Sequence, residues 1–218
     1  MELIVSRPTG ARVVQDYLSG AGAAPAFFGP RFDAPDAFAA KAVEVDGRFD
    51  REARARAVEA LIVPPGADEA RLQRFVEEGG YMVTTGQQPG LYGGPLYSIH
   101  KALTAVRLAE AVEAQLGKPV LPVFWVASDD HDWAEANHAD LITLANELQR
   151  FELSAAEEDR TPPLHRISLG PDADEVLAKF VEALPDTDFS EEYVATLHDI
   201  MSVNRLDSAD EAYLGDTP

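Results

Sequence analysis

Cysteine is missing from this chain of 218 residues. A protein without thiols forms no disulfide and has no thiolate of its own for nucleophilic catalysis or metal binding. Long apolar runs are missing as well, since no stretch approaches the roughly 20 residues that a membrane-spanning helix needs. The opening sequence, MELIVSRP, lacks the basic segment and apolar core of a secretory signal peptide. We therefore expect a cytoplasmic protein that does not enter a membrane.

Positive charge is scarce in this sequence. Eighteen Lys and Arg residues stand against 38 Asp and Glu, which gives a net charge of −20. Such a chain repels nucleic-acid backbones and anionic lipids, so we expect neither as a partner. A small anionic ligand would need a local group of backbone N–H donors and basic side chains. The alternative interpretation of the charge is a solvated acidic surface without a specific role.

The sequence divides into two parts. Residues 1–66 predict a helical or irregular lead-in that packs on a core, and residues 67–218 predict the core itself. Apolar spacing and turn residues predict helices and strands within these parts. The expected helices cover residues 51–61, 67–79, 95–116, 172–184 and 190–203, and the expected strands cover residues 81–85, 120–127, 140–144, 149–153 and 165–169. The polar end of the chain closes no element, so we expect a truncated or frayed terminus.

The middle of the core predicts a strand–helix–strand unit. A short β-rich run ends at Gly86, and a long amphipathic helix follows, with Pro95 in its first turn and Gly117 at its end. The next run, residues 120–127, is continuously apolar, as in a parallel strand covered on both faces. This order is typical of an α/β protein with a doubly wound, mostly parallel sheet.

A glycine-rich loop joins the first strand to the long helix. Its glycines at positions 86, 90, 93 and 94 would let backbone approach a ligand beside the helix N-terminus. His100 and Lys101 follow in the helix, where both could face a phosphate. The spacing matches neither of the two common phosphate-binding loops, so a tight turn with positive φ angles remains an equal alternative. A packed histidine and a solvated lysine are the corresponding alternative for the pair.

A polar cluster follows the second strand. It comprises Asp129, Asp130, His131 and Asp132, with Glu135, Asn137 and His138 downstream. Loops after adjacent parallel strands face one crevice, so this cluster and the glycine-rich loop are expected to converge. His131 could serve as a general base whose tautomer an aspartate fixes, or the loop could simply be acidic surface. The histidine spacing fits no standard zinc pattern, and we expect no tightly bound metal. The nucleophile motif of serine hydrolases is absent.

Two long stretches carry a resemblance. TGQQPGLYGGPLYSIHK, residues 85–101, and PVFWVASDDHD, residues 122–132, followed by Asn137 and His138, resemble the two signatures of the BshC family, the cysteine ligases of bacillithiol biosynthesis. The order and spacing of both signatures agree with that family. Asp129 departs from it, because family members usually have a glutamate at that position. Family members are also about twice as long as this chain or longer, so the fragment alone need not be active.

The resemblance implies a Rossmann-like nucleotide-binding core, related in layout to class I aminoacyl-tRNA synthetases and pantothenate synthetase. It implies a reaction that joins L-cysteine to glucosaminyl malate, with ATP or ADP in the crevice and Mg²⁺ entering with the nucleotide. It also implies a coiled coil and a possible homodimer in the full-length protein. By matching positions, the crevice would be lined by Gly86, Gln87, Gln88, Gly93, Gly94, His100 and Lys101. The catalytic residues would be Asp130, His131 and Asp132, together with His100 and Lys101.

Two other functions remain open on the sequence alone. A non-catalytic module could bind a nucleotide and a protein partner without turnover. A relative of the nucleotidyltransferases could use the same crevice to activate another carboxylate. The acidic surface disfavours a version that acts on tRNA.

Overall fold

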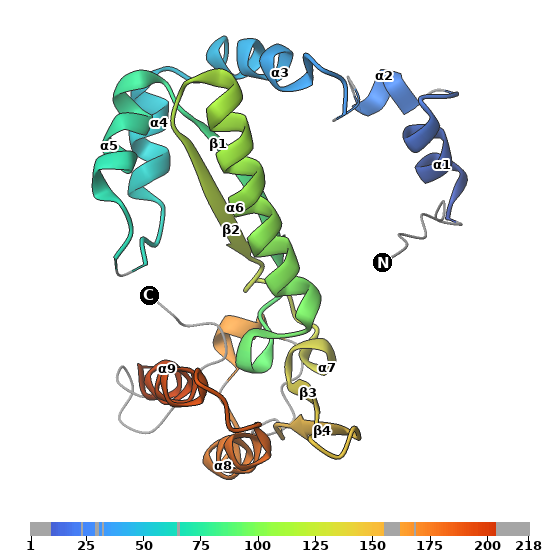
Figure 1. Cartoon of the computed structure of the whole chain (residues 1–218), viewed down its shortest axis with the longest axis vertical. Helices are drawn as coiled ribbons and strands as arrows, with labels where there is room; N and C mark the ends of the chain where they lie inside the picture. Colours follow the sequence, from blue (N-terminus) through green and yellow to red (C-terminus); the bar gives the residue numbers. More distant parts are fainter. Residues whose placement is uncertain are drawn as a thin grey trace. The chain divides into compact units, whose positions relative to one another are not determined.

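The computed structural model describes residues 10–22, 24–28, 31, 33–64, 66–154, 162–167 and 169–203. The chain falls into two compact units, one of residues 1–81 and 111–120 and the other of residues 82–110 and 121–218. Figure 1 shows the elements in chain order, from the blue helices of the first unit to the red helices of the second. In the described residues, each helix is too short or too polar to cross a bilayer.

Five helices make up most of the described part of the first unit. They are α1 (Arg12–Ser19), α2 (Ala24–Phe28), α3 (Ala37–Asp46), α4 (Arg51–Glu59) and α5 (Glu69–Glu78). The carboxylates of Asp50 and Asp68 cap the N-termini of α4 and α5 by accepting a backbone N–H three residues on. Gly79, with a φ of 74°, ends α5 in the left-handed conformation. The helices expected at 51–61 and 67–79 are thus confirmed.

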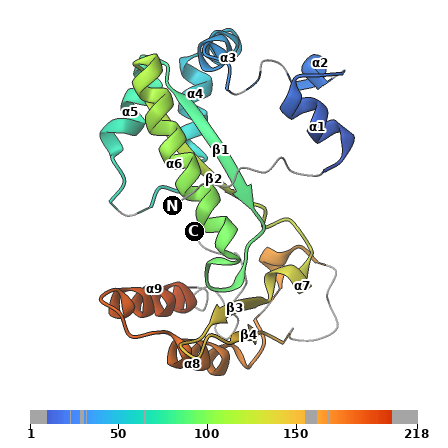
Figure 2. The same ribbon diagram turned by 45° about the vertical axis from the view of Figure 1, so that its right-hand side comes forward.

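The buried Arg54 ties these helices to the start of the sheet. Its Nε donates to the carbonyl of Gly80 at 2.9 Å, and its guanidinium also pairs with Asp46 at 2.7 Å. A buried guanidinium is tolerated only when its donors are satisfied, as they are here by a carboxylate and by backbone carbonyls. The helix α4 lies beside α5 in both ribbon views (Figures 1 and 2).

The strand–helix–strand unit is confirmed. It consists of β1 (Tyr81–Gln87), the short 3₁₀ helix η1 (Leu91–Gly93), α6 (Leu96–Leu116) and β2 (Val120–Val126). The N–H of Tyr81 donates to Pro119 at 2.9 Å, and the N–H of Ala127 donates to Gln87 at 3.0 Å. Both partners advance together along the chain, so β1 and β2 are parallel. The helix α6 runs alongside this pair in both views.

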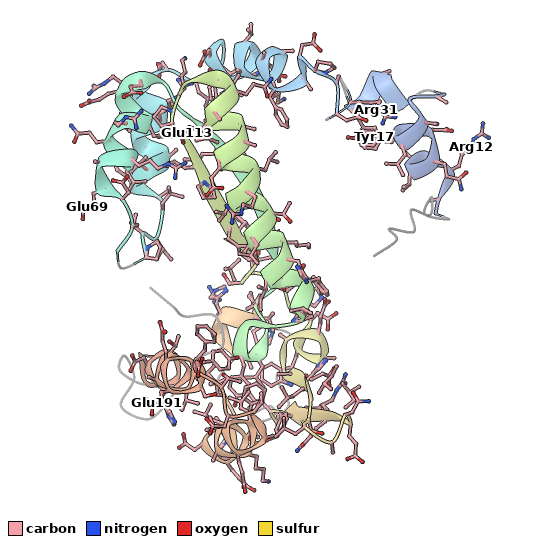
Figure 3. The ribbon with its side chains drawn as sticks, viewed as in Figure 1. Arg12, Tyr17, Arg31, Glu69, Glu113 and Glu191 are labelled. Carbon is pink, nitrogen blue, oxygen red and sulfur yellow. The ribbon has the colours of Figure 1, made fainter. Side chains whose placement is uncertain are left out.

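A carboxylate on α6 fixes the turn into β2. Glu113, labelled in Figure 3, accepts a hydrogen bond from the backbone nitrogen of Val120 at 3.0 Å. Arg71 of α5 pairs with the same carboxylate and also donates to the carbonyl of Val120 at 2.9 Å. These contacts fix the position of the start of the second strand.

The end of β2 is less covered than the sequence predicts. Val120 and Leu121 are buried, whereas Trp125 is 68% exposed and its neighbours Phe124 and Val126 are also exposed. The two-stranded sheet gives β2 a single hydrogen-bonded neighbour within the described residues, so this half of the strand lacks its second neighbour and its second covering layer. An apolar row of α6 is exposed as well; it comprises Leu96, Ile99, Leu103 and Val106.

The next two strands form a separate antiparallel hairpin. They are β3 (His138–Ile142) and β4 (Leu148–Glu152), which follow the short helix α7 (Trp133–Ala136). His138 pairs with Glu152 and Ile142 with Leu148. The connection between them is too short for a parallel crossover, and Asn146 turns the chain at a φ of 61°. The strands expected at 140–144 and 149–153 therefore exist, displaced by one or two residues.

The strand expected at 165–169 is wrong over its first residues. Leu164–Arg166 form a 3₁₀ helix, η2, because their backbone is engaged elsewhere. The N–H of Leu164 donates to Asp130, and the N–H of His165 donates to Ser128, which leaves neither for a strand ladder. Residue 168 lies outside the described residues.

Two helices complete the core of the second unit. They are α8 (Ala173–Ala183) and α9 (Ser190–Val203), close to the expected bounds of 172–184 and 190–203. Phe180 of α8 meets Phe151 of β4 edge-on, with ring centroids 5.2 Å apart. Trp133, Leu153 and Leu164 are buried in the same cluster. This core holds α7 and η2, the two elements that carry and brace the polar loop after β2.

Candidate functional site

The end of β1 meets the first turns of α6. The ammonium of Lys101 donates to the side-chain oxygen of Gln87 at 2.7 Å and to the carbonyl of Gly86 at 3.2 Å. Tyr97 stands one helical turn before Lys101, and its ring centroid is 5.4 Å from the Lys101 Nζ. The lysine that the sequence predicts as a phosphate ligand is thus anchored to the glutamine motif.

Glu135, on the short helix α7 that follows β2, also contacts this group. Its two carboxylate oxygens accept from the hydroxyl of Tyr97 at 3.3 Å and from the amide of Gln88 at 3.5 Å. The amide of Gln87 donates to the Tyr97 hydroxyl at 3.2 Å and to the side-chain oxygen of Gln88. We call Gln87, Gln88, Tyr97, Lys101 and Glu135 the Lys101–Glu135 network. It links residues after β1, on α6 and after β2.

Partial desolvation and the Glu135 carboxylate both affect the pKa of Tyr97. Partial desolvation raises the pKa of its hydroxyl, and the nearby Glu135 carboxylate raises it further. Tyr97 therefore remains a neutral donor toward Glu135 at physiological pH. The donors of the network all point from Lys101 toward Glu135, which is the direction that mutual polarisation favours.

Two of the predicted glycines have packing roles. A Cβ on Gly86 would lie 2.6 Å from the Trp125 carbonyl, so a side chain there would push β1 away from β2. A Cβ on Gly90 would lie 2.6 Å from the Cα of Gly94 across the closed loop. Gly93 and Gly94 have φ angles of 94° and 69°, so the loop needs them for its turn. The tight-turn interpretation therefore holds alongside any ligand role.

Asp130 organises the loop that follows β2. Its Oδ1 accepts the backbone N–H of His131 at 2.6 Å and that of Asp132 at 3.0 Å. The N–H of Asp132, then that of His131, holds the pKa of the Asp130 carboxyl below its ordinary value, and the Gln88 amide contributes. The imidazole of His131 is 78% exposed, with its Nδ1 3.8 Å from the same Asp130 oxygen.

Asp132 acts as a helix cap. Its Oδ1 accepts the backbone N–H of Glu135 at 3.1 Å and starts α7. The 3₁₀ helix η2 also holds this loop, because His165 donates its backbone N–H to the carbonyl of Ser128 at 3.1 Å. Asp132 therefore positions Glu135, while the imidazole of His131 stays exposed in the loop.

The remaining predicted residues lie outside the network. His100 is exposed on α6, and in the described part of the chain no hydrogen bond or ion pair joins it to His131. Asn137 is buried and donates to the carboxylate of Glu152 and to the carbonyl of Leu153, while His138 contacts the Asn137 side chain at 3.2 Å. That pair stabilises the hairpin. Within the described ranges, no three His, Asp or Glu side chains are grouped as a metal site would require.

The sequence analysis assigns no role to Tyr97, and it places Glu135 in the polar cluster without a catalytic or binding role. Both had a local signal. Tyr97 precedes Lys101 by four residues on a helix, which places the two side chains on one face. Glu135 follows Asp132 by three residues, the spacing of a helix-capping box. Its partnership with Gln88, 47 residues earlier, depends on the tertiary fold and has no local signature.

Comparison with known families identifies the family of the chain. Residues 1–212 match the family described as "Bacillithiol biosynthesis BshC, N-terminal Rossmann-like domain". That match covers nearly the whole chain, including both strands and both loops of the site. A Rossmann-like domain is consistent with the parallel β1–α6–β2 unit.

Individual relatives are similar over the same region. Proteins named "Putative cysteine ligase BshC" are 37% identical over 153 residues in Symbiobacterium thermophilum and 40% identical over 136 residues in Heliobacterium modesticaldum. These alignments cover 69% and 62% of this chain but only 27% and 24% of the relatives. The relative from Oceanobacillus iheyensis is 41% identical over 108 residues, which are 48% of this chain and 20% of its own. The chain thus spans about a quarter of the length of the curated relatives it matches.

Proposed function

Because the chain belongs to the BshC family, we propose that it forms part of a ligase that joins L-cysteine to glucosaminyl malate in bacillithiol biosynthesis. The Lys101–Glu135 network is the observation that supports this most directly. It brings an ammonium, two amides, a phenol and a carboxylate to the ends of two parallel strands, where ligands of Rossmann-like domains bind. The proposed enzyme works in the cytoplasm on small molecules, with no nucleic-acid or membrane partner.

The proposed reaction forms one amide bond. The amine nitrogen of glucosaminyl malate attacks the carboxyl carbon of cysteine, loses a proton, and a carboxyl oxygen departs. Two kinds of group are required of the protein: a cation near the carboxylate, and a base near the amine. Lys101 supplies the cation. The chain has no cysteine, so the thiol of the product belongs to the substrate.

His131 is the better of the two candidate bases. The backbone donors that hold Asp130 lower its pKa and so reduce its affinity for a proton. A general base works best when its pKa lies near the working pH, which disfavours such a carboxylate. We therefore assign proton removal to the exposed imidazole of His131 and the orientation of the loop to Asp130. Asp132 positions Glu135, and His100 contacts a ligand from the α6 side.

We further propose that a nucleotide binds on this side of the site. ATP, when bound, supplies a phosphoryl or adenylyl group that turns the departing carboxyl oxygen into a leaving group. His100 would hold its phosphates, with backbone near Gly93 and Gly94 and the amides of Gln87 and Gln88. The positive charge of Lys101 would attract the phosphates, while its free donor binds the carboxylate of cysteine. Gly86 contributes its carbonyl to Lys101. ADP would occupy the same donors, and Mg²⁺ would enter with either nucleotide.

The proposal extends to the complete sheet of the domain. We infer that β1 and β2 are two strands of a larger doubly wound, mostly parallel sheet. The exposed Phe124, Trp125 and Val126 at the end of β2 support this, because such residues are usually covered in a parallel strand. A coiled coil and a homodimer complete the proposed full-length enzyme.

Binding of a nucleotide without turnover is the alternative for a chain that spans about a quarter of its relatives. Isothermal titration with ATP and with ADP, each with and without Mg²⁺, tests the nucleotide. The His100→Ala, Lys101→Ala double variant should lose binding. A matched control replaces the exposed His198 and Lys179 of α9 and α8 by alanine and should bind as the wild type does.

Turnover decides between the two functions. The chain, and a full-length relative beside it, are incubated with L-cysteine, glucosaminyl malate, ATP and Mg²⁺ under reducing conditions. Product with the mass of the amide supports the ligase. Nucleotide binding without product in both proteins would leave the non-catalytic module as the function.

A further inference from the structure

Lys101 differs from the other lysines of the chain in its partners. Lys41, Lys118 and Lys179 each form an ion pair with a carboxylate. The ammonium of Lys101 instead contacts a backbone carbonyl and the amide oxygen of Gln87, and no carboxylate among the described residues pairs with it. In a protein with 38 acidic residues, a cation kept away from carboxylates is available for an anion from outside.

Glu135 is a carboxylate without a cationic partner among the described residues. Its carboxylate accepts only from the phenol of Tyr97 and the amide of Gln88, and no cation of the described chain pairs with it. Glu135 is exposed, and its two protein donors use only part of its capacity, since carboxylate oxygens offer about four acceptor sites, so the rest are open to a ligand. The Lys101–Glu135 network thus ends in one unpaired cation and one unpaired anion, joined through Gln87 and Tyr97.

The unused hydrogen-bonding capacity has a definite pattern. Lys101 has three N–H donors, of which two are occupied by Gly86 and Gln87. One donor therefore remains on the cation, and acceptor sites remain on Glu135. A ligand that fills both must offer a negative acceptor to Lys101 and a positive donor to Glu135.

We propose that this network is a subsite for an α-amino acid in its zwitterionic form, with the carboxylate on Lys101 and the ammonium on Glu135. A free phosphate would satisfy Lys101 but would bring more negative charge close to Glu135. A zwitterion adds no net charge to a chain that already carries −20. The inference rests on the proposed function in that cysteine is the amino acid, and it identifies Tyr97 and Glu135 as residues that determine which substrate binds.

The subsite would recognise the two charged groups of the ligand separately. L-Cysteine carries both, its methyl ester lacks the carboxylate, and N-acetyl-L-cysteine lacks the ammonium. Titration calorimetry under reducing conditions should therefore give weaker binding for each analogue than for L-cysteine, by about tenfold or more for each lost charged hydrogen bond. D-glucosamine, a cation without a carboxylate, serves as a further probe.

Single substitutions test which residue binds the carboxylate of the ligand and which binds its ammonium. Lys101→Met should weaken L-cysteine about tenfold but leave the methyl ester unchanged, and Glu135→Gln should weaken both of these while leaving N-acetyl-L-cysteine unchanged. Lys179→Met and Glu147→Gln are the matched controls, because both side chains are exposed and distant in sequence from the network. Circular dichroism and the unfolding midpoint confirm that each variant is folded.

Three results would overturn the subsite: no binding of L-cysteine at millimolar concentration, equal binding of all three ligands, or equal losses for every ligand in both variants. The subsite and the proposed ligase reaction can be tested separately. Binding with the expected pattern but no amide product in any full-length relative would uphold the subsite and remove the proposed reaction. Amide product with a KM for cysteine unaffected by either substitution would uphold the proposed reaction and remove the subsite.

Discussion

The carboxylate of Glu113 lies 3.0 Å from the backbone nitrogen of Val120, from which it accepts a hydrogen bond across the turn between α6 and β2. That bond, together with the Arg71 guanidinium, outweighs desolvation and lowers the pKa of Glu113. The side chain is 30% exposed, so solvent screens it only partly. The helix and the strand that carry opposite sides of the site are joined by this single carboxylate.

Glu113→Gln should lower the free energy of unfolding by about 1–2 kcal/mol at pH 7, because a charged acceptor is replaced by a neutral one. The folded pKa of Glu113 is depressed, so its contribution is present above the unfolded value of 4.5 and is lost as the pH falls through the folded pKa. Urea denaturation between pH 7 and pH 3 measures this. The difference between wild type and variant should shrink on acidification.

Glu110→Gln is the control for that experiment. Glu110 is on the same helix and pairs with Arg107, but both side chains are more than half exposed. Exposed pairs contribute little, so this variant should stay within about 0.5 kcal/mol of the wild type at either pH. A Glu113→Gln effect that is equally large at pH 3 would show that the carboxylate charge is not its cause.

Gly86→Ala should destabilise the protein by about 1–3 kcal/mol, the usual cost of overpacking. The added methyl group would lie 2.6 Å from the carbonyl oxygen of Trp125, and backbone cannot move aside as a flexible side chain can. Gly47→Ala is the matched control. Gly47 has a helical φ of −73°, and a Cβ there would make only ordinary contacts, the nearest at 3.5 Å from the carbonyl oxygen of Val43, so alanine should be neutral or stabilising. Thermal unfolding compares the two, and equal melting temperatures would contradict the close strand approach.

The elements of this fold are largely predictable because their signals are local. The helices at 51–59 and 69–78 begin at aspartate caps, and the helices at 69–78 and 96–116 end at a glycine, so these signals lie beside the elements themselves. The strand expected at 165–169 fails for a tertiary reason. Leu164 and His165 donate to the loop after β2, and nothing in their own sequence reveals those distant acceptors.

The site is predictable only to the level of its motifs. Both loops were assigned to one end of the sheet from strand order, and the structure joins them through Gln88 and Glu135. Individual roles are harder to predict, since carboxylates in motifs cap helices as well as bind ligands. Asp132 looks catalytic in the sequence, yet its Oδ1 holds the first turn of α7. The distinction depends on which backbone N–H groups are left without partners after folding.

Asp132 and its variants separate capping from catalysis. Asparagine caps helices about as well as aspartate, whereas alanine costs about 1 kcal/mol. Asp132→Asn should therefore keep L-cysteine affinity near that of the wild type, and Asp132→Ala should weaken it by displacing Glu135. Calorimetric titration of the two folded variants provides the comparison. A loss of affinity in Asp132→Asn equal to that in Asp132→Ala would assign Asp132 to the ligand itself.

The two tryptophans report on the uncovered end of β2. Trp125 is 68% exposed and Trp133 is 5% exposed. Trp133→Phe leaves Trp125 as the only emitter, so its fluorescence should be red-shifted and strongly quenched by acrylamide. Trp125→Phe leaves the buried Trp133, whose emission should be blue-shifted and resistant to quenching.

The two variants should also differ in their free energy of unfolding. Loss of the exposed Trp125 indole should change the unfolding free energy by less than about 0.5 kcal/mol, as surface substitutions usually do. Trp133→Phe removes buried apolar surface and should cost about 1–3 kcal/mol. If Trp125 emission proved as protected as that of Trp133 in the isolated chain, β2 would already have a cover in solution. The proposed doubly wound sheet would then need no further strand beside it.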